Sequence, residues 1–186
     1  MAALQAGDDT ALAELMSRWE VPVKAFLLRL GVPSQSVEDI AQDAFVRLYE
    51  KRARFKPGSA LKPWLLTLAG NLARNALRWK SRHPTESLEA SGPEDDSSRD
   101  LPDPAGRSPS ESAVERSRGE EVRAAVAGLP APLRMAVVCV DLEEMSYDEA
   151  AIVMSCSRKA VETRLYRARR LLRDSLRSFL PDSRSG

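Results

Sequence analysis

The sequence predicts an all-α protein, built as two small helical domains joined by a flexible acidic linker. Only 5% of the 186 residues are aromatic and 9 are glycine, which argues against long β-sheets, whereas the helix formers Ala, Leu, Arg and Glu are frequent. Apolar residues recur at helical spacing in both halves. Between the halves, residues 84–117 are rich in Pro, Ser, Asp and Glu. That segment cannot bury enough apolar surface to offset its chain entropy.

Charge divides the chain in the same way. Residues 1–83 carry 13 basic and 8 acidic side chains, residues 84–117 carry 3 and 9, and residues 118–186 carry 12 and 10. Two mildly basic blocks therefore flank an acidic one, an asymmetry that indicates nucleic acid contacted by separate modules. We expect domains at 1–83 and 118–180, with a linker at 84–117 and a tail at 181–186.

The first domain should begin with a helical stretch from Thr10 to Leu30, which Pro22 divides or kinks. A second helix follows, capped by Ser36. Its apolar positions form one stripe, and its opposite face is polar. The stripe consists of Val37, Ile40, Ala41, Ala44, Phe45 and Leu48.

A basic loop from Lys51 to Lys62 leads into a helix from about Pro63 to Arg82. Aromatic and cationic residues alternate here, a composition that suits single-stranded nucleic acid, in which bases stack on rings and phosphates pair with cations. Taken alone, the pattern favours Trp64 as a core residue beneath a basic outer face over a nucleic-acid contact.

After the linker we expect four short helices, at about Glu120–Leu129, Leu133–Leu142, Ser146–Met154 and Ser157–Phe179. The third opens with a Ser-Tyr-Asp-Glu capping box, and a tight turn separates it from the basic fourth helix. This order is typical of a helix-turn-helix, whose second helix enters the major groove of DNA. Apolar residues of the two helices should pack together to fix their crossing angle: Ala150, Ala151, Val153 and Met154 against Val161 and Leu165.

Other classes of protein are harder to reconcile with this chain. Its two cysteines and single histidine cannot form a disulfide framework or a four-ligand zinc site. No nucleophile–base pair is apparent, so we expect neither an enzyme nor a cofactor. Without a signal sequence or a membrane-length apolar run, a cytoplasmic protein is expected. A conventional regulator with a helical sensor domain stays open, although it leaves the basic aromatic helix of the first domain unexplained.

Two long segments of the first domain resemble region 2 of the sigma-70 family of RNA polymerase sigma factors: Val37–Tyr49 (VEDIAQDAFVRLY) and Trp64–Arg78 (WLLTLAGNLARNALR). The Leu129–Arg134, Ser146–Ala151 and Val161–Arg169 segments are similar to region 4 of the same family. The segments follow the family's order and spacing. The short linker and the absence of a third domain resemble the extracytoplasmic-function (ECF) subgroup.

The resemblance implies an initiation subunit that binds core RNA polymerase and directs promoter recognition at −35 and −10 elements. It implies docking on the β′ clamp helices through Asp39, Gln42, Asp43 and Arg47. It implies −10 recognition and melting by Phe55, Lys62, Asn71, Arg74, Asn75 and Arg78. It implies −35 recognition by Arg158, Lys159, Glu162, Thr163, Arg164 and Arg167.

The resemblance also implies partners beyond promoter DNA. The β flap of the polymerase is expected to be contacted, and the acidic linker is expected to thread toward the active centre and RNA exit path. An anti-sigma factor is expected as a regulator that clamps both modules. No catalytic residue, metal or direct membrane insertion is expected.

Overall fold

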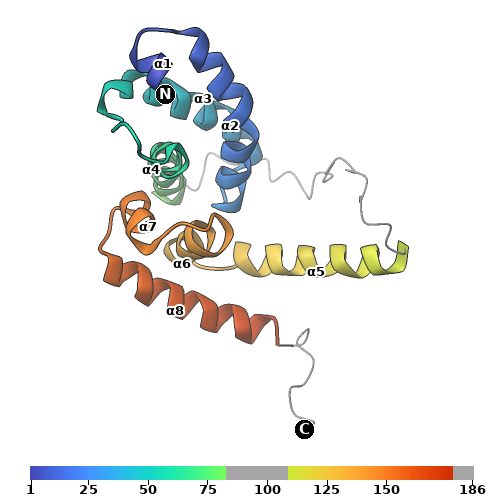
Figure 1. Cartoon of the computed structure of the whole chain (residues 1–186). Helices are drawn as coiled ribbons and strands as arrows, with labels where there is room; N and C mark the ends of the chain where they lie inside the picture. The colour runs from blue at the N-terminus through green and yellow to red at the C-terminus, as the bar shows by residue number, and fades with distance from the viewer. Residues whose placement is uncertain (83–108, 178–186) are drawn as a thin grey trace.

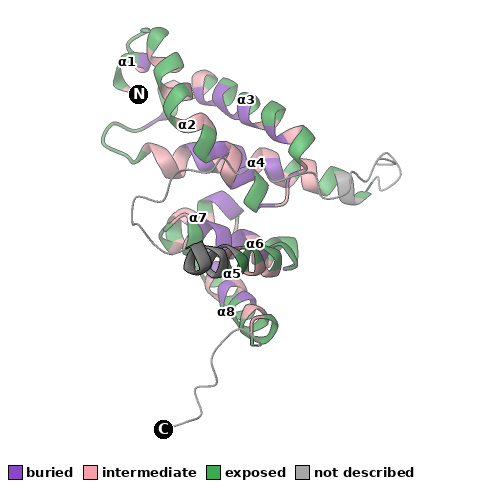
Figure 2. Cartoon of the chain, turned by 90° about the vertical axis from the view of Figure 1, so that its right-hand side faces the viewer, coloured by how far each residue is buried: buried purple, intermediate pink, exposed green. Residues whose placement is uncertain are grey.

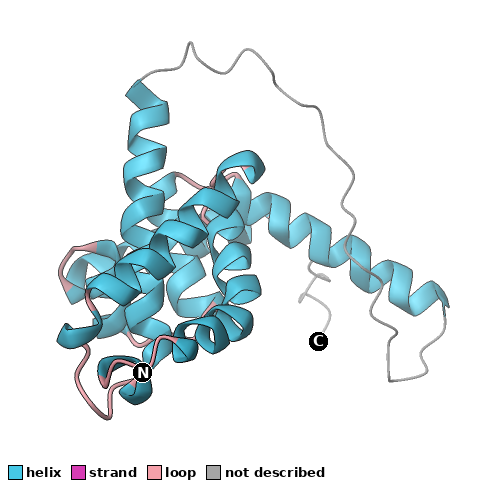
Figure 3. Cartoon of the chain, turned by 90° about the horizontal axis from the view of Figure 1, so that it is seen from above, coloured by secondary structure: helices cyan, strands magenta, loops and turns pink. Residues whose placement is uncertain are grey.

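The computed structural model describes residues 1–82 and 109–177, and every regular element within those two ranges is helical (Figures 1 and 3). The predicted all-α fold is confirmed. The part of the predicted linker from 84 to 108 and the tail from 181 lie outside the described residues.

The first unit consists of α1 (Ala2–Gln5), α2 (Thr10–Arg29), α3 (Ser34–Glu50), the 3-10 turn η1 (Arg52–Arg54) and α4 (Leu61–Arg82). The apolar stripe predicted for α3 faces inward, where it packs on α2 and α4. The short α1 also holds the loop before α4, because the Gln5 side-chain amide donates to the carbonyls of Arg52 at 2.7 Å and Phe55 at 2.9 Å.

Two local predictions for this unit need correction. Of the two outcomes predicted for Pro22, division is contradicted, because helix α2 runs through Pro22 to Arg29. Pro22 and Arg18 both lie on the exposed side, so water can satisfy the Arg18 carbonyl that the missing proline N–H leaves unpaired. Helix α3 begins at Ser34 rather than being capped by Ser36, since Pro33 takes the extended conformation of the N-cap residue (φ −57°, ψ 140°).

The second unit consists of α5 (Pro109–Ala127), α6 (Ala131–Val137), the π-helical turn η3 (Val138–Leu142), α7 (Tyr147–Met154) and α8 (Arg158–Ser175). The four helices predicted after the linker are present, with α6 and η3 together occupying the second. In η3 the N–H of Glu143 donates to the carbonyl of Val138 at 2.9 Å, five residues earlier.

Helix α5 starts well before its predicted beginning at Glu120, inside the segment that we expected to be extended. Proline at the first helical position has no N–H to leave unsatisfied, and good helix formers such as Ala and Glu follow it in the sequence. The helix projects from the rest of the molecule, and its C-terminal part lies next to α6 (Figure 1).

The two units pack directly on each other, with α7 lying across α4 (Figures 1 and 2). Gly70 of α4 is a point of close approach. A Cβ atom at Gly70 would lie 2.9 Å from Cγ1 of Val153 in α7 and 3.7 Å from the ring of Phe26 in α2. Buried residues of both units consequently form one continuous apolar cluster.

Candidate nucleic-acid interface

Helices α7 and α8 form the predicted helix-turn-helix. The Ser146 hydroxyl accepts the N–H of Glu149 at 3.2 Å, and the Glu149 carboxylate accepts the N–H of Ser146 at 2.9 Å, which confirms the capping box. Ser155 ends α7 in the left-handed conformation (φ 48°, ψ 52°). Ser157 then starts α8, where its hydroxyl accepts the N–H of Ala160 at 3.2 Å. The left-handed residue Ser155 and the Ser157 cap therefore define the two ends of the turn.

Buried side chains set how the two helices cross. Ala150 and Val153 of α7 are fully buried, as are Val161 and Ala168 of α8, and Leu165 is 2% exposed. The packing predicted between the helices is present. The apolar side of α8 is thereby occupied, and its opposite side faces solvent.

That outward side of α8 carries half of the residues predicted for duplex recognition. Lys159, Thr163 and Arg167 are exposed at spacings of four residues, and the side chain of Lys159 is 87% exposed. Three further exposed side chains lie on the same side but were not among the residues predicted for duplex recognition, although the same spacing identifies them: Tyr166, Arg170 and Arg173.

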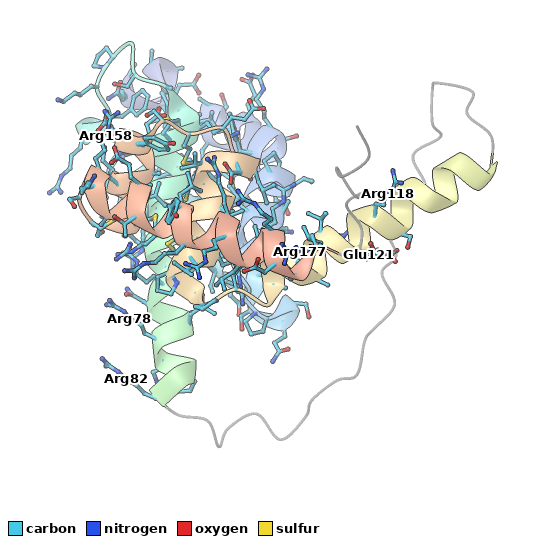
Figure 4. All side chains as sticks on the ribbon, turned by 90° about the horizontal axis from the view of Figure 1, so that it is seen from below. Arg78, Arg82, Arg118, Glu121, Arg158 and Arg177 are labelled. Atoms are coloured by element: carbon cyan, nitrogen blue, oxygen red, sulfur yellow. The ribbon has the colours of Figure 1, made fainter. Side chains whose placement is uncertain are left out.

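Arg158 and Glu162 lie at one edge of this surface, and Arg158 is tied to α7. The Arg158 guanidinium contacts Asp148 at 3.1 Å and Glu162 at 3.4 Å, and it lies over the ring of Tyr147 at 5.8 Å. Both ion pairs are exposed, so they orient Arg158 without adding much stability. Arg158 remains accessible at the N-terminal end of α8 (Figure 4).

Arg164 points toward the first unit instead. It lines a cleft of about 340 Å³ between α4, α6 and the α7–α8 turn, together with Arg74 and Arg78. The cleft joins three arginines with the apolar side chains of Leu77, Pro132, Met135 and Met154. Residues predicted for two different DNA elements are therefore neighbours in this arrangement.

The polar face of α4 brings together the residues predicted for the −10 element. Asn71, Arg74, Asn75 and Arg78 recur at helical spacing, and Asn75 and Arg78 are exposed. Figure 4 shows Arg78 and Arg82 on the end of α4 that projects beyond α8, both directed away from the helices. This end of α4 is the accessible part of the predicted surface.

Arg74 is engaged within the molecule. Its guanidinium donates to the carbonyl of Val153 at 2.8 Å and that of Met154 at 3.3 Å, and it also contacts the side chain of Asn71. Burial, followed by repulsion from Arg78, lowers the pKa of this guanidinium from its ordinary value.

The loop residues predicted for the −10 element have partners too. Phe55 is only 7% exposed, and its ring packs edge-on against Trp64 with 5.1 Å between ring centroids. In this position the Phe55 ring is part of the core and cannot stack on a base. Lys62 lies 3.1 Å from the carboxylate of Glu143 and donates to its carbonyl at 2.9 Å.

A separate surface lies on the outer side of α3. Asp39, Gln42, Asp43 and Arg47 are all exposed there, as predicted for a docking face. Val46 lies among them and is 55% exposed. Sequence reasoning missed it, although its helical position between Gln42 and Asp43 places it on the same side. The surface therefore has an apolar centre within a charged rim.

Two further observations concern only the described residues. Among them, no helix is long and apolar enough to cross a membrane. Within the same ranges, no group of three or more His, Cys, Asp or Glu side chains could hold a metal ion.

Comparison with protein families gives two matches along the chain. Residues 15–83 match the model of Sigma-70 region 2, and residues 119–172 match that of Sigma-70, region 4. The chain is 30% identical to the RNA polymerase sigma-H factor of Pseudomonas aeruginosa, over 97% of this chain and 93% of that protein. It is also 30% identical to the ECF RNA polymerase sigma-E factor of Escherichia coli K12, over 95% and 92%.

Solved structures show the same fold. CnrH, in complex with the cytosolic domain of CnrY, superposes with a TM-score of 0.63 at 25% identity, over 95% of this chain and 94% of that chain. The sigma factor RpoE of Bartonella quintana, in complex with the anti-sigma factor NepR, gives a TM-score of 0.64 at 23% identity, over 89% and 96%.

Proposed function

The chain belongs to the ECF group of the sigma-70 family, and from this premise we propose that its surfaces divide the work of transcription initiation. The protein is an RNA polymerase sigma factor that directs promoter recognition and transcription initiation. One observation carries the proposed division. Three charged faces lie on three different helices: a basic face on α8, a basic face on α4 and an acidic face on α3.

The outward side of α8 reads the −35 element as duplex DNA. Lys159, Thr163 and Arg167 have the exposure and spacing to face a major groove, and Arg170 and Arg173 extend the cationic side along phosphates. Arg158, already oriented by Asp148, contacts a base edge or phosphate at the helix start.

The polar face of α4 contacts the −10 element. Asn71 and Asn75 supply amide donors and acceptors that can read base edges, and Arg74 and Arg78 supply cations for the phosphates. Lys62 adds a cation from the start of the helix. Phe55 has no direct part in this proposal, because it supports Trp64 from within the core.

The outer side of α3 docks on core polymerase. A charged rim around an apolar centre is the usual anatomy of a protein interface, and Val46 provides that centre between Asp39 and Asp43. The β′ clamp helices are the proposed partner of this face, and the β flap is the proposed partner of the second unit.

An anti-sigma factor is the proposed regulator. The Bartonella RpoE is seen in complex with the anti-sigma factor NepR, CnrH is seen in complex with the cytosolic domain of CnrY, and both share this fold. The protein is further proposed to act in the cytoplasm, where the polymerase operates, and to contribute binding surfaces to the polymerase rather than chemistry of its own.

The test is a reconstituted transcription assay with bacterial core polymerase on DNA from upstream of the protein's own gene. We expect a specific start that appears only when the protein is added. Lys159→Ala should weaken duplex −35 binding and leave core binding intact, whereas Asp39→Ala combined with Gln42→Ala should do the reverse. If both variants lose the same activity, the proposed division of labour is wrong.

A further inference from the structure

The N-terminal segment that contains α1 is anchored to the first unit at two points. The side chain of Leu4 is fully buried and belongs to the apolar cluster. After α1, the Asp9 carboxylate accepts the hydroxyl of Tyr49, near the end of α3, at 3.0 Å. This segment is therefore fixed beside the point where α3 ends and the loop before α4 begins.

Gln5 bridges two carbonyl groups of that loop from this fixed position. Its side-chain nitrogen donates to the carbonyl of Arg52 at 2.7 Å and to that of Phe55 at 2.9 Å. A primary amide carries two N–H donors on one nitrogen, which is what a bridge between two acceptors requires. The two carbonyls flank the 3-10 turn η1, so the bridge fixes the shape of this turn.

The turn is held more firmly than the satisfaction of its polar groups requires. Both bonds from Gln5 are part-buried, so water can replace them. The Arg52 guanidinium also donates to the carbonyl of Tyr49 at 2.9 Å and lies over the ring of Tyr49 at 4.0 Å. Because ordering each of these side chains costs entropy, their convergence on one short turn indicates that its conformation matters.

These contacts support the tip of the loop, residues 56–60. All five residues are exposed, and the N–H of Ser59 donates to the carbonyl of Lys56 at 3.1 Å. Gly58 has a φ of +79°, and a Cβ atom there would meet nothing within 4 Å. The tip therefore stands clear of the helices, and its position depends on the turn that precedes it.

The tip and its flanks have the chemistry of a contact with single-stranded DNA. Exposed cations at Arg54 and Lys56 precede the tip, and Lys62 of the proposed −10 surface follows it. The small residues Gly58–Ala60 leave backbone N–H and C=O groups accessible to a strand. A loop that presents these groups in many arrangements binds more weakly, in proportion to the time it spends in the competent one.

Resting on the proposed function, we propose that Gln5 is a positioning residue for −10 recognition, whose amide holds the loop in the conformation that presents its tip to the unpaired strand. Gln5 acts through the loop and does not contact DNA. Its loss frees the tip but leaves the polar face of α4 unchanged. The base preference of one part of the melted segment therefore depends on a side chain of the N-terminal helix.

Two variants remove the bridge in different ways. Gln5→Met keeps the unbranched shape and the neutral charge but has no N–H donor. Gln5→Glu keeps the shape and replaces the donors with oxygen atoms that repel the two carbonyls. The matched controls are Ala3→Met and Ala3→Glu, which place the same side chains at an exposed position of α1 without removing a side-chain hydrogen bond.

The assay is transcription by the full chain with core polymerase, on promoter DNA from upstream of the protein's own gene. Each base pair of the melted segment is replaced in turn, and permanganate reactivity of thymines measures melting. A freed loop that is competent about a tenth of the time should give about tenfold fewer open complexes. We expect both Gln5 variants to lose discrimination at some positions of the melted segment and to keep it at the others and at −35.

Both Ala3 controls should keep the wild-type pattern, and all four variants should compete for core polymerase as the wild type does, since no docking residue is changed. An equal loss at every promoter position, −35 included, would mean that Gln5 merely stabilises the fold and would overturn the proposal. Unchanged yield and base preference in both Gln5 variants would overturn it too. Absence of any specific start with the wild type would instead refute the sigma function, so the two failures are distinguishable.

Discussion

Val46→Asp is expected to break the docking of α3 on core polymerase without disturbing the fold. The Val46 side chain is 55% exposed, so it contributes little to the core that the other side of α3 forms with α2 and α4. Aspartate at this position would point into solvent in the isolated protein. Its effect should therefore appear only when the surface is covered by a partner.

The magnitude follows from the exposed area of this side chain. Full burial of a valine contributes roughly 1.5–3 kcal/mol, so covering the exposed half contributes about 1 kcal/mol. Burying an unpaired carboxylate among Asp39 and Asp43 adds a desolvation and repulsion cost of at least about 2 kcal/mol. Together these predict a loss of about 3 kcal/mol, or more than a hundredfold in affinity for core polymerase.

The assay is competition between labelled wild-type protein and each unlabelled variant for core polymerase. The matched control is Val21→Asp, since Val21 is 73% exposed but lies on α2, outside the proposed docking face. Thermal unfolding should show both variants to be as stable as the wild type. If Val46→Asp competes as well as Val21→Asp, the α3 face is not where the polymerase binds.

Four other outcomes are expected. Ser146→Ala removes the hydroxyl that accepts the Glu149 N–H, so it should lower the free energy of unfolding by about 1 kcal/mol, measured by urea denaturation, whereas Ser146→Asp should restore most of that loss. Arg167→Ala should lower by about 1 the slope of log affinity for duplex DNA against log salt, and an unchanged slope in salt titrations would place Arg167 away from phosphate. Burial raises the pKa of the Cys139 thiol to about 12 from its ordinary 9.0, so a thiol reagent at neutral pH should modify only the half-exposed Cys156 until the chain unfolds. The same shift should make stability fall as the pH rises above 9, because the unfolded chain then releases the Cys139 proton and the folded chain retains it, as pH-dependent denaturation would show.

Local patterns predicted the features that depend on neighbours in sequence. The Ser146–Glu149 capping box, the inward stripe of α3 and the packing of α7 on α8 all follow from residue type and helical spacing. The same reasoning failed where solvent or a distant segment decides the outcome. Pro22 was expected to divide or kink a helix, but the helix continues through it, because at an exposed position water can satisfy the carbonyl that loses its hydrogen bond.

Tertiary partners account for the remaining differences in the candidate site. Phe55 and Lys62 fit a nucleic-acid loop by composition, yet Trp64 buries the first and Glu143 binds the second. Helical periodicity predicts that Val153 is buried in the helix-turn-helix core. It does not predict that Val153 also faces Gly70 of the other unit. Sequence patterns therefore could not predict that the two units pack on each other.

The π-helical turn at Val138–Leu142 makes chain length in this segment important. A turn closed by a bond between residues five apart holds one more residue than an α-helical turn. Deleting that residue would rotate everything after it by about 100° around the helix axis. The rotation would carry Glu143 away from Arg29 and Lys62, whose side chains contact its carboxylate at 2.6 Å and 3.1 Å. Homologues that have gained or lost a single residue here would therefore be unable to form this contact, even where all three charged residues are unchanged.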